Sequence, residues 1–319
     1  MKNYLKIIKK AKTIALFSHN SPDPDTVGST LGLYNALVKM GKSVDLFCET
    51  EDLKKFEFIE EAKLYNSKEF IAENYDLLIA IDIARLNMLG KYEDAFSSHK
   101  NTLRLDHHTK DEPVACVDIV KVYSACAILI YEVVKALKVK IDSKIATALY
   151  FAICGDTGIF RNNNTDSLTF RISAELLDKG AEIRKIYAEF FDKKTVPYIK
   201  LTSNVILNAD INDEFGYVVM SASKDDFEKF GISYEESLGN IANTYLNCGY
   251  KVSAFLKEKQ DGIYGSFRSK FEYDCSEIAA KFGGGGHKNA SGFLIEKPLS
   301  EAIKDVHEAI KEYLENYNK

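Results

Sequence analysis

The stretch Thr13-Ile-Ala-Leu-Phe-Ser-His-Asn-Ser-Pro-Asp-Pro-Asp25 joins a short apolar run to one histidine and two aspartates. The apolar run predicts a buried strand. Apolar residues then recur at helical spacing, at Val27, Leu31, Tyr34 and Val38. A strand, a polar turn and an amphipathic helix in this order are typical of an α/β protein built on a parallel sheet.

Acidic or acid–histidine residues follow apolar runs three more times in the first half of the chain. They are Asp82, Asp106-His107-His108 and Asp156, after the runs Leu77-Leu-Ile-Ala-Ile, Leu103-Arg-Leu and Leu149-Tyr-Phe-Ala-Ile. In an open parallel sheet, such runs bring the residues after them to one edge, the carboxyl ends of the strands. Carboxylates that meet there at ~5 Å repel by about 3 kcal/mol per pair at an effective dielectric of ~20. Two divalent cations would offset that charge.

The first ~190 residues alternate strand-like and helical patterns, as βαβ units do. We expect strands at Thr13–Ser18, Ser43–Cys48, Tyr75–Ile81, Asn101–Leu105 and Val114–Ile119, and a buried helix from Ile145 to Ile153. After Phe191 the pattern changes to strand-like runs at Tyr217–Ser221, Val252–Leu256, Tyr264–Phe267 and Gly292–Ile295, before a last amphipathic helix. The expected organisation is a parallel-sheet α/β domain over 1–191, a linker over 192–208 and a smaller mixed α/β domain over 209–319.

Composition excludes several classes of protein. Of the 319 residues, 46% are hydrophobic and 28% are charged, which is ordinary for a soluble globular protein. The longest apolar stretch, Ile145 to Cys154, is about half the ~20 residues that span a bilayer, so we expect no membrane segment. The basic residues at the start of the chain precede only a five-residue apolar run, which is too short for a signal peptide, and this favours a cytoplasmic location. A net charge of −5 argues against long duplex nucleic acid as a partner but allows a short anionic substrate at a local basic site.

The first polar cluster, His19-x-x-x-Asp23-x-Asp25, has both a structural and a chemical explanation. Helix capping explains one aspartate, because Asp25 or Thr26 makes a good N-cap, but it leaves His19 and Asp23 unexplained. Imidazole with carboxylates suits Mn²⁺, with Mg²⁺ or Co²⁺ as alternatives. Asp82 alone would be an ordinary turn residue, yet from a neighbouring strand end its carboxylate could bridge two ions.

Asp106-His107-His108 is a stronger signal than a single histidine. Adjacent residues on extended chain point in opposite directions, so the two histidines should differ in role. One can bind a metal, while the other faces the substrate as a phosphate donor or a proton-transfer group. Asp106 would orient an imidazole by hydrogen bonding to it, without binding the metal itself.

Asp156, in Cys154-Gly-Asp-Thr-Gly158, is explained equally well as a turn residue when taken singly. The combination is more informative than any member. Six residues of metal-ligand type follow apolar runs: His19, Asp23, Asp25, Asp82, His107 and Asp156. Two ions ~3.5–4 Å apart would lower the pKa of a bridging water and hold a phosphoryl group for in-line attack.

In the second half, the glycine run Gly283–Gly286 precedes His287. A flexible linker is the simplest explanation of such a run. However, apolar residues bracket it closely, which suits a loop whose backbone N–H groups approach an anion. Arg268 follows a strand pattern and could form a bidentate pair with phosphate.

Together these residues resemble the DHH phosphoesterases that carry a C-terminal DHH-associated domain. Among these, the chain is most similar to the branch of nanoRNases and 3′-phosphoadenosine 5′-phosphate (PAP) phosphatases. The segments that carry the resemblance extend over nearly the whole chain and are highly specific in combination. They are His19–Asp25, Asp106–His108, Gly155–Arg161, Ser266–Ser269 and Gly283–His287.

The resemblance implies one Mn²⁺ on His19, Asp23 and Asp82, and a second on Asp25, Asp82, His107 and Asp156. It implies a catalytic role for His108, which would face the scissile phosphate, and for Asp106 beside it. Further substrate contacts would come from Arg161 and, across an interdomain cleft, from the second domain. Those of the second domain are Arg268, Ser269, Gly284, Gly285, Gly286 and His287. A homodimer is left open.

The implied activity is the hydrolysis of very short oligoribonucleotides to mononucleotides. Its alternatives are a PAP phosphatase, a hydrolase of linear dinucleotides derived from cyclic ones, and a nucleotide-binding regulatory protein with a relic site. A long-strand exonuclease would need a basic, aromatic-lined channel, which the acidic balance disfavours. The chain departs from the family pattern beside the ions, but not at any implied ligand. The departures are Arg85, Met88, Asp111 and Gly155.

Overall fold

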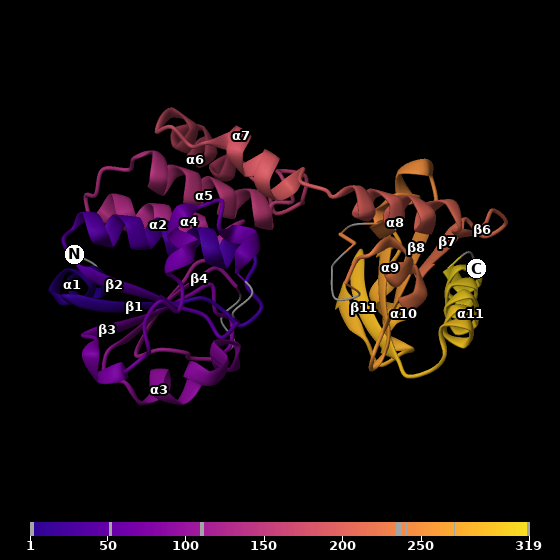
Figure 1. The fold of residues 1–319 in the computed structure, drawn as a ribbon, viewed down its shortest axis with the longest axis horizontal. Helices are drawn as coiled ribbons and strands as arrows, with labels where there is room; N and C mark the ends of the chain where they lie inside the picture. The colour runs from indigo at the N-terminus through magenta and orange to yellow at the C-terminus, as the bar shows by residue number, and fades with distance from the viewer. Residues whose placement is uncertain are drawn as a thin grey trace. The chain divides into compact units, whose positions relative to one another are not determined.

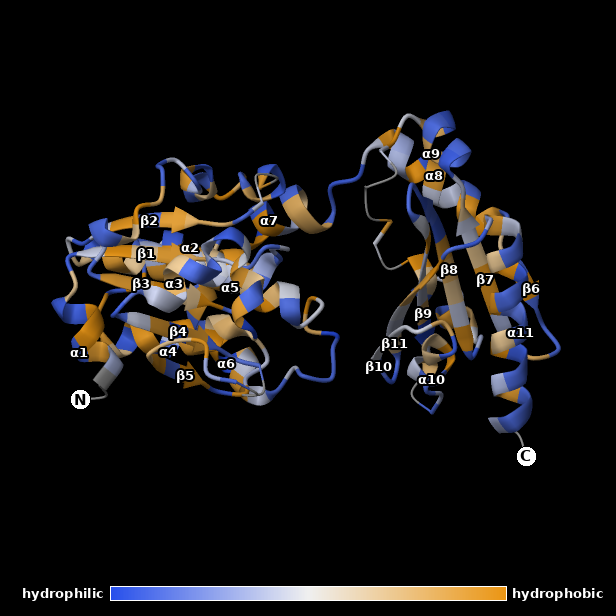
Figure 2. Cartoon of the chain, turned by 90° about the horizontal axis from the view of Figure 1, so that it is seen from below, coloured by the Kyte–Doolittle hydropathy of each residue, from blue (hydrophilic) through white to orange (hydrophobic). Residues whose placement is uncertain are grey.

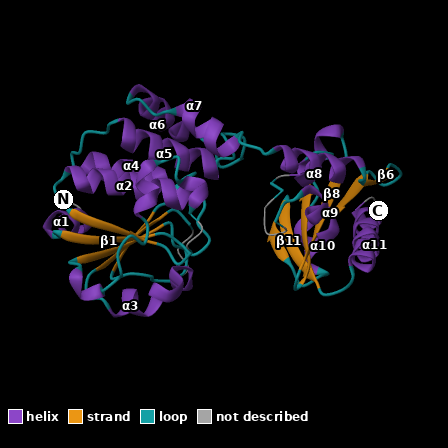
Figure 3. Ribbon diagram, viewed as in Figure 1, coloured by secondary structure: helices purple, strands orange, loops and turns teal. Residues whose placement is uncertain are grey.

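The computed structural model describes residues 3–50, 53–108, 112–233, 238–239, 241–270 and 272–317. The chain divides into two compact units, Met1–Lys193 and Lys194–Lys319, and each is taken by itself below. Each unit is a β-sheet packed against helices, as Figure 3 shows. The predicted α/β class is confirmed, with a parallel sheet in the first unit and a mixed sheet in the second.

The sheet of the first unit is parallel and has the strand order β2-β1-β3-β4-β5 in the described part of the chain. The strands are β1 Thr13–Phe17, β2 Ser43–Phe47, β3 Leu77–Ile81, β4 Thr102–Asp106 and β5 Val117–Val120. All five expected strands are found, each with bounds shifted by at most a few residues. Because β1, β3 and β4 are neighbours, the residues after their carboxyl ends lie along one edge of the sheet.

Helices surround this sheet. They are α1 Asn3–Lys10, α2 Pro24–Lys39, α3 Glu93–Ser98, α4 Cys126–Ala136, α5 Ser143–Asp156, α6 Ser167–Asp178 and α7 Ile183–Ile186. Short 3₁₀ segments span Lys54–Phe56, Glu60–Leu64, Ala72–Asn74 and Leu86–Tyr92 (η4), and a π-helical turn spans Tyr187–Phe191. In Figure 1, α2, α4 and α5 lie on one side of the strands and α3 lies on the other.

The alternation of apolar side chains along the strands explains this layering. Leu16 and Ile79 point into the core beneath the helices α2, α4 and α5. Their neighbours Phe17 and Ala80 point to the opposite face, into an aromatic-rich cluster that includes Phe96 of α3. With both faces covered, β1 and β3 consist almost entirely of apolar residues, and β1 and β2 are largely orange in Figure 2.

Helix α2 begins at the first polar cluster. Asp23 is its N-cap: the side chain accepts a hydrogen bond of 2.9 Å from the N–H of Thr26, and Pro24 occupies the first turn. The expectation that Asp25 or Thr26 caps the helix is therefore wrong. Proline suits the first helical position because its φ is already helical and it has no N–H to satisfy, so the cap falls one residue earlier. Asp25 is left inside the first turn, where its carboxylate is available for other contacts.

The sheet of the second unit has the order β10-β11-β9-β8-β7-β6, with β7 and β8 parallel and the other pairs antiparallel, in the described residues. Its strands are β6 Asp210–Asn212, β7 Tyr217–Ala222, β8 Val252–Lys259, β9 Gly262–Ser269, β10 Gly285–His287 and β11 Ala290–Ile295. Its helices are α8 Val196–Leu207, α9 Lys224–Phe230, α10 Cys275–Ala280 and α11 Leu299–Tyr317, with 3₁₀ turns at Ile241–Asn243 and Leu246–Cys248.

Helix α8 occupies most of the segment 192–208, where the sequence suggested a linker. Its side chains Leu201 and Val205 are buried against β7 and α9, so the helix packs within the second unit. The boundary between the two compact units falls in the chain between Lys193 and Lys194. In the described part of the chain, no helix combines the length and apolar character that a membrane crossing requires.

Candidate metal centre

The six predicted ligands all lie at or beside the carboxyl edge of the first sheet. His19 comes two residues after β1, Asp82 directly after β3, and His107 directly after β4. Helices supply the others: Asp23 and Asp25 come from the start of α2, and Asp156 is the last residue of α5. The fourth carboxylate therefore comes from a helix end, at the C-terminus of the buried helix that the sequence predicts.

Two clusters of potential ligands share one carboxylate. In the first, Nε2 of His19 lies 3.8 Å from Oδ2 of Asp23 and 3.9 Å from Oδ2 of Asp82. In the second, Nε2 of His107 lies 3.6 Å from Asp25, 3.2 Å from Asp156 and 3.4 Å from Oδ1 of Asp82. The ligand atoms in each of the groups His19–Asp23–Asp82 and Asp25–His107–Asp156 lie within 4.8 Å of one another. Asp82 thus offers one oxygen to each cluster.

The donor atoms fit divalent cations. Asp82 is only 2% exposed, and its Oδ1 has no hydrogen-bond partner among the described residues. A buried acceptor without a partner costs free energy unless an ion or a water satisfies it. The set combines imidazole nitrogens with carboxylate oxygens, which is the chemistry of intermediate and hard divalent metals.

Electrostatics supports the same conclusion. Burial, together with the charges of Asp156 and Asp23, raises the pKa of Asp25. Burial and the neighbouring carboxylates of Asp25 and Asp23 likewise raise the pKa of Asp82, and burial raises that of Asp156. At Asp23, burial also opposes ionisation, but contacts with His19 and the helix N–H groups prevail and lower the pKa. Three of the four carboxylates are therefore costly to ionise together without added positive charge.

Further groups hold the ligands in place. The carboxylate of Asp25 accepts hydrogen bonds from Ser29 Oγ (2.9 Å) and from the N–H groups of Cys126 (2.6 Å) and Ala127 (3.1 Å), at the start of α4. Nδ1 of His107 lies 3.0 Å from the carbonyl oxygen of Tyr123, which leaves Nε2 to face the carboxylates. The sequence prediction missed these supports. The onset of helical periodicity near Ala127 indicated a helix start, but not what that start would contact.

His108 is a neighbour of the six: its Nδ1 lies 3.6 Å from Oδ1 of Asp82, and Asp82, His107 and His108 form a third group of possible ligands. Its Nδ1 lies 2.8 Å from Oδ1 of Asp106, which also accepts hydrogen bonds from the N–H groups of His107 (2.8 Å) and His108 (3.3 Å). The Asp106 hydrogen bond raises the pKa of His108 despite its partial burial. With Nδ1 so engaged and 44% of the side chain exposed, Nε2 is the nitrogen left for a substrate. The two histidines differ in exposure, but the expectation that they point in opposite directions is wrong: their ring centroids are 4.5 Å apart, and both rings approach Oδ1 of Asp82.

Strained backbone surrounds the cluster. Asp82 has φ of +60°, and after Asp156 the residues Gly158, Ile159 and Phe160 have φ of +54°, +60° and +61°. A β-branched residue such as isoleucine rarely adopts this conformation, which persists only where the surrounding structure enforces it. This turn leads into Arg161, which is exposed and donates through Nε to the carbonyl of Gly158 at 3.0 Å. This hydrogen bond holds the Arg161 side chain against the turn that follows Asp156.

In the second unit, Arg268 and His287 share one row of the sheet. His287 pairs with Ala290 across β10 and β11, and Ala290 pairs with Arg268 across β11 and β9. Directly paired residues point to the same face, so Arg268 and His287 share a face about 10 Å apart. Ser291, next to Ala290, is buried, whereas Gly292 on the shared face is exposed. The row therefore lies on the more exposed face of these strands.

The glycine segment is more regular than a simple loop. Gly285 and Gly286 belong, with His287, to the short edge strand β10, and all three are exposed. Gly284 approaches β11 so closely that a Cβ there would lie 2.2 Å from the carbonyl oxygen of Gly292. Ser269 is buried, and its hydroxyl donates to the carbonyl of Tyr273 at 2.8 Å.

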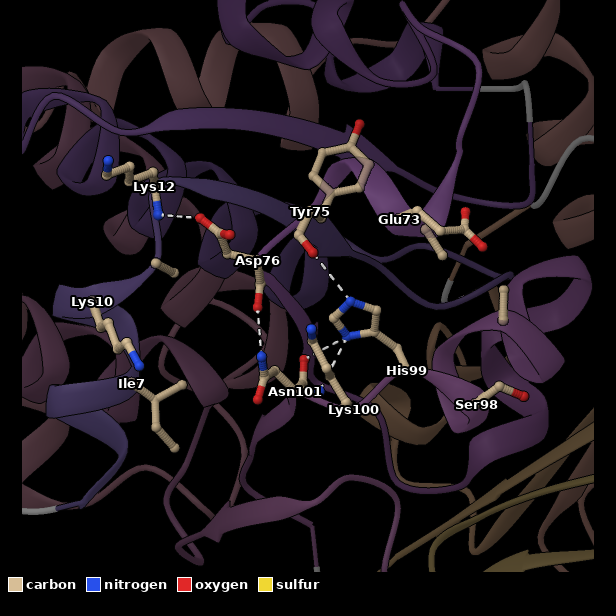
Figure 4. Close-up of a pocket in the computed structure, with 13 residues that line it drawn as sticks. Ile7, Lys10, Lys12, Glu73, Tyr75, Asp76, Ser98, His99, Lys100 and Asn101 are labelled. Carbon is tan, nitrogen blue, oxygen red and sulfur yellow. Dashed lines mark hydrogen bonds between the residues drawn. The ribbon is translucent and has the colours of Figure 1, made fainter.

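A separate hollow of about 950 Å³ lies at the opposite edge of the first sheet (Figure 4). Lys12, Asp76 and Asn101, which line it, directly precede β1, β3 and β4. None of the six candidate ligands lines this hollow. The carboxylate of Asp76, which lines the hollow, accepts hydrogen bonds from the N–H groups of Lys12 (2.7 Å) and Thr13 (3.1 Å). The hollow is therefore distinct from the candidate metal centre.

Comparison with known families agrees with this geometry. Residues 13–153 match the N-terminal domain of the DHH family, and residues 218–316 match the DHHA1 domain. The chain is a DHH–DHHA1 protein. These matches confirm the resemblance that the sequence motifs indicated.

Relatives of this DHH–DHHA1 protein match it along most of its length. The bifunctional oligoribonuclease and PAP phosphatase NrnA of Thermus thermophilus is 28% identical over 307 residues, which cover 94% of this chain and 90% of that protein. The Bacillus subtilis protein of the same name is 28% identical over 305 residues, with 91% and 92% covered. The crystal structure of an exopolyphosphatase-related protein from Bacteroides fragilis superposes with a TM-score of 0.88 at 26% identity, with 99% and 96% covered.

The departures of this DHH–DHHA1 protein from the family pattern have different structural settings. Met88 contributes its main chain: its carbonyl accepts a hydrogen bond of 2.8 Å from the N–H of Asn20, next to His19. Because the acceptor is the main-chain carbonyl, this hydrogen bond does not depend on which side chain is at position 88. Arg85 is exposed, three residues after Asp82. Asp111 lies outside the described residues.

Proposed function

We propose that this chain is a phosphodiesterase that uses two divalent cations to hydrolyse very short oligoribonucleotides to mononucleotides. The observation that carries the proposal is the position of Asp82, whose two oxygens face His19 in one ligand cluster and His107 in the other. Two-metal sites are typical of enzymes that hydrolyse phosphate esters. The names of the NrnA relatives support short oligoribonucleotides as the substrate class.

One cation would be held by His19, Asp23 and Asp82, and the other by Asp25, Asp82, His107 and Asp156. Bound there, the cations would activate a water and neutralise charge on the phosphate. We propose Mn²⁺ as the metal, because imidazole and carboxylate ligands in this proportion suit it, with Mg²⁺ or Co²⁺ as alternatives. The protein's contribution is to fix these ligands before substrate arrives, through the α4 N-terminus and the Tyr123 carbonyl.

His108 would act on the substrate through Nε2. Its Nδ1 is held by Asp106, so the ring is fixed in orientation and its raised pKa favours the protonated form. A protonated imidazole can donate a hydrogen bond to the scissile phosphate and pass a proton to the leaving oxygen. Asp106 would stabilise the charge on that ring, as a carboxylate behind a catalytic histidine does.

Other side chains would bind the non-reacting part of the substrate. Arg161, held in the strained turn after Asp156, would contact a phosphate near the cations. On the second unit, the row of Arg268 and His287 offers cationic and hydrogen-bonding groups for a terminal phosphate. Gly284, Gly285 and Gly286 would line this site, with the N–H of Gly284 already donated to the carbonyl of Ala279 at 3.0 Å, and Ser269 would support it from the opposite face of the sheet. Residues 1–191 would then form the catalytic domain and residues 209–319 a substrate-binding domain, joined through 192–208.

The direct test is turnover of a 5′-phosphorylated dinucleotide by the Mn²⁺-loaded protein, with mononucleotides separated by chromatography. We expect release of both mononucleotides, and loss of release in Asp82→Asn. Asp178→Asn, an exposed carboxylate at the end of α6, serves as the matched control and should be as active as wild type. Cleavage of pyrophosphate with intact dinucleotide would contradict the proposal.

A second candidate function uses the same centre on a different substrate. The relatives are named for PAP phosphatase activity as well as for oligoribonuclease activity, so PAP and linear dinucleotides derived from cyclic ones are the next candidates. Comparing turnover of PAP, a linear diadenylate and a five-residue RNA separates these substrates. A regulatory protein with a relic site would bind them all without turnover.

A further inference from the structure

A buried arginine lies beside the candidate metal centre. Arg104 of β4 is 0% exposed and is among the largest fully buried side chains in the described part of the chain. Arg104 and Asp106 are two residues apart on one strand, so they point to the same face of the sheet. Asp118 of β5 pairs with Arg104 in register. The guanidinium forms ion pairs with both carboxylates: Nε lies 3.0 Å from Oδ1 of Asp118, and Nη1 lies 3.8 Å from Oδ2 of Asp106, an oxygen with no hydrogen-bond partner among the described residues.

The same guanidinium also contacts the main chain beyond two candidate site residues. Nη1 donates to the carbonyl oxygens of Ala84 (3.2 Å) and Ile83 (3.4 Å), directly after the shared ligand Asp82. Nη2 donates to the carbonyl of Glu112 (3.3 Å), four residues beyond His108. One planar group thus connects the chain segments that carry Asp82 and the paired histidines. A lysine ammonium has no planar fork with which to span these partners.

Stability alone gives little reason for a charge in this position. A buried ion pair is often no more stabilising than an apolar pair of similar volume, because both charges lose their hydration. The strain at Asp82, with φ of +60°, has to be maintained by its surroundings, and the Ile83 and Ala84 carbonyls are the next groups along the chain. The hydrogen bonds that Arg104 donates to these two carbonyls would hold the backbone of Asp82 in this conformation.

We propose that Arg104 is a positioning residue for the candidate metal centre. It fixes the Asp106 carboxylate, and through it the His108 ring, and it clamps the backbone that holds Asp82. Its effect on catalysis rests on the proposed function, whereas its effect on ligand geometry does not.

The test compares Arg104→Lys with the double variant Arg104→Met, Asp118→Asn. The first keeps the charge but loses the fork, and the second removes the Arg104–Asp118 pair together, so that Asp118 is not left as an unpaired buried charge. Lys144→Met is the control, since it removes an ion pair with the largely buried Glu61 (2.6 Å) at the far end of α5. Lys144 is twelve positions from Asp156, about 18 Å along the helix.

Four quantities are measured in each variant: the melting temperature, Mn²⁺ affinity by electron paramagnetic resonance, kcat and KM on a dinucleotide, and the downfield NMR signal of the His108 Nδ1–H. Assignment of that signal comes from its loss in His108→Gln. We expect both Arg104 variants to fold, with Mn²⁺ affinity and kcat lowered about 10–100-fold and KM changed less than threefold. The His108 signal should shift or broaden. Lys144→Met should change only the melting temperature.

Wild-type Mn²⁺ affinity, kcat and His108 signal in the Arg104 variants, with a changed melting temperature alone, would overturn the inference. If Arg104→Lys fails to fold, the double variant decides by the same readouts. If the double variant also fails to fold, the single variant Asp118→Asn decides. Wild-type values in that variant support the inference that Arg104 acts through Asp106 and the carbonyls. Loss of Mn²⁺ affinity in it contradicts that inference. If the wild type does not cleave dinucleotides, the proposed function fails, while Mn²⁺ affinity and the NMR signal still test Arg104.

Discussion

Gly155 lies against Pro24 so closely that a Cβ on the glycine would be 2.5 Å from the proline Cβ. The two residues belong to the C-terminal turn of α5 and the first turn of α2, next to the ligands Asp156 and Asp25. A side chain at position 155 would therefore separate two carboxylates that both face His107. The glycine at this departure from the family pattern is required by the proline opposite.

We expect Gly155→Thr to destabilise the protein by about 1–3 kcal/mol, because overpacking at a close contact forces the two helices apart. It should also weaken Mn²⁺ binding. Gly285→Ala is the control for stability, since a Cβ there meets nothing within 4 Å. Thermal unfolding of the metal-free proteins measures the loss of stability, and titration with Mn²⁺ measures the loss of binding. Equal melting temperatures for Gly155→Thr and wild type would show that α2 and α5 are not constrained here.

Neutralising the shared carboxylate should stabilise the metal-free protein while it abolishes activity. The pKa of Asp82 is raised by burial and by the Asp25 and Asp23 charges, so the folded state holds a proton that the unfolded chain releases above pH ~3.9. The stability linked to this proton is fully present at low pH and is lost as pH rises through the raised pKa. Asp82→Asn avoids that loss, so the variant should be more stable than the wild type at neutral pH without metal.

The measurement is the difference in unfolding free energy between Asp82→Asn and wild type, without metal, from pH 5 to pH 8. The difference should grow with pH, and saturating Mn²⁺ should reverse it by stabilising only the wild type. Asp178→Asn should show no such trend. A difference that shrinks as pH rises would contradict the electrostatic account.

Removal of the imidazole at position 108 should reduce turnover without emptying the metal site. His108→Gln is expected to lower kcat about 10²–10⁴-fold, the range of general acid–base catalysis, with little change in Mn²⁺ affinity. His107→Gln is the matched comparison, because its Nε2 faces three carboxylates, and it should lose metal affinity as well. Steady-state kinetics with Mn²⁺ titration separates the two. Equal losses of metal affinity would make His108 a ligand.

Arg268 should affect substrate binding more than chemistry. We expect Arg268→Ala to raise KM for a dinucleotide about 10–100-fold, the value of a charged hydrogen bond of roughly 1.5–3 kcal/mol, with kcat nearly unchanged. Lys270→Ala, two residues further on, is the control, since its Nζ donates to the Gly249 carbonyl. A fall in kcat with constant KM in Arg268→Ala would place this residue in the chemical step instead.

Much of this protein could be predicted from sequence because its signals are local. Apolar runs gave the five parallel strands, and the residues that end them gave the clusters around Asp82. The N-cap was misplaced because capping residues at Asp23 and Asp25 look alike in sequence, and Pro24 decides between them. Arg104 gave no signal as a partner of Asp118, because that pair depends on the register of β4 and β5. Contacts that depend on strand register or on the close packing of two helices cannot be predicted from local sequence and are seen only in the folded chain.

Anomalous diffraction from crystals grown with Mn²⁺ tests the central claim most directly. The account predicts two manganese peaks ~3.5–4 Å apart, one beside His19 and Asp23, the other beside Asp25, His107 and Asp156, with the Asp82 carboxylate between them. A single peak, or peaks that Asp82 does not touch, would contradict it.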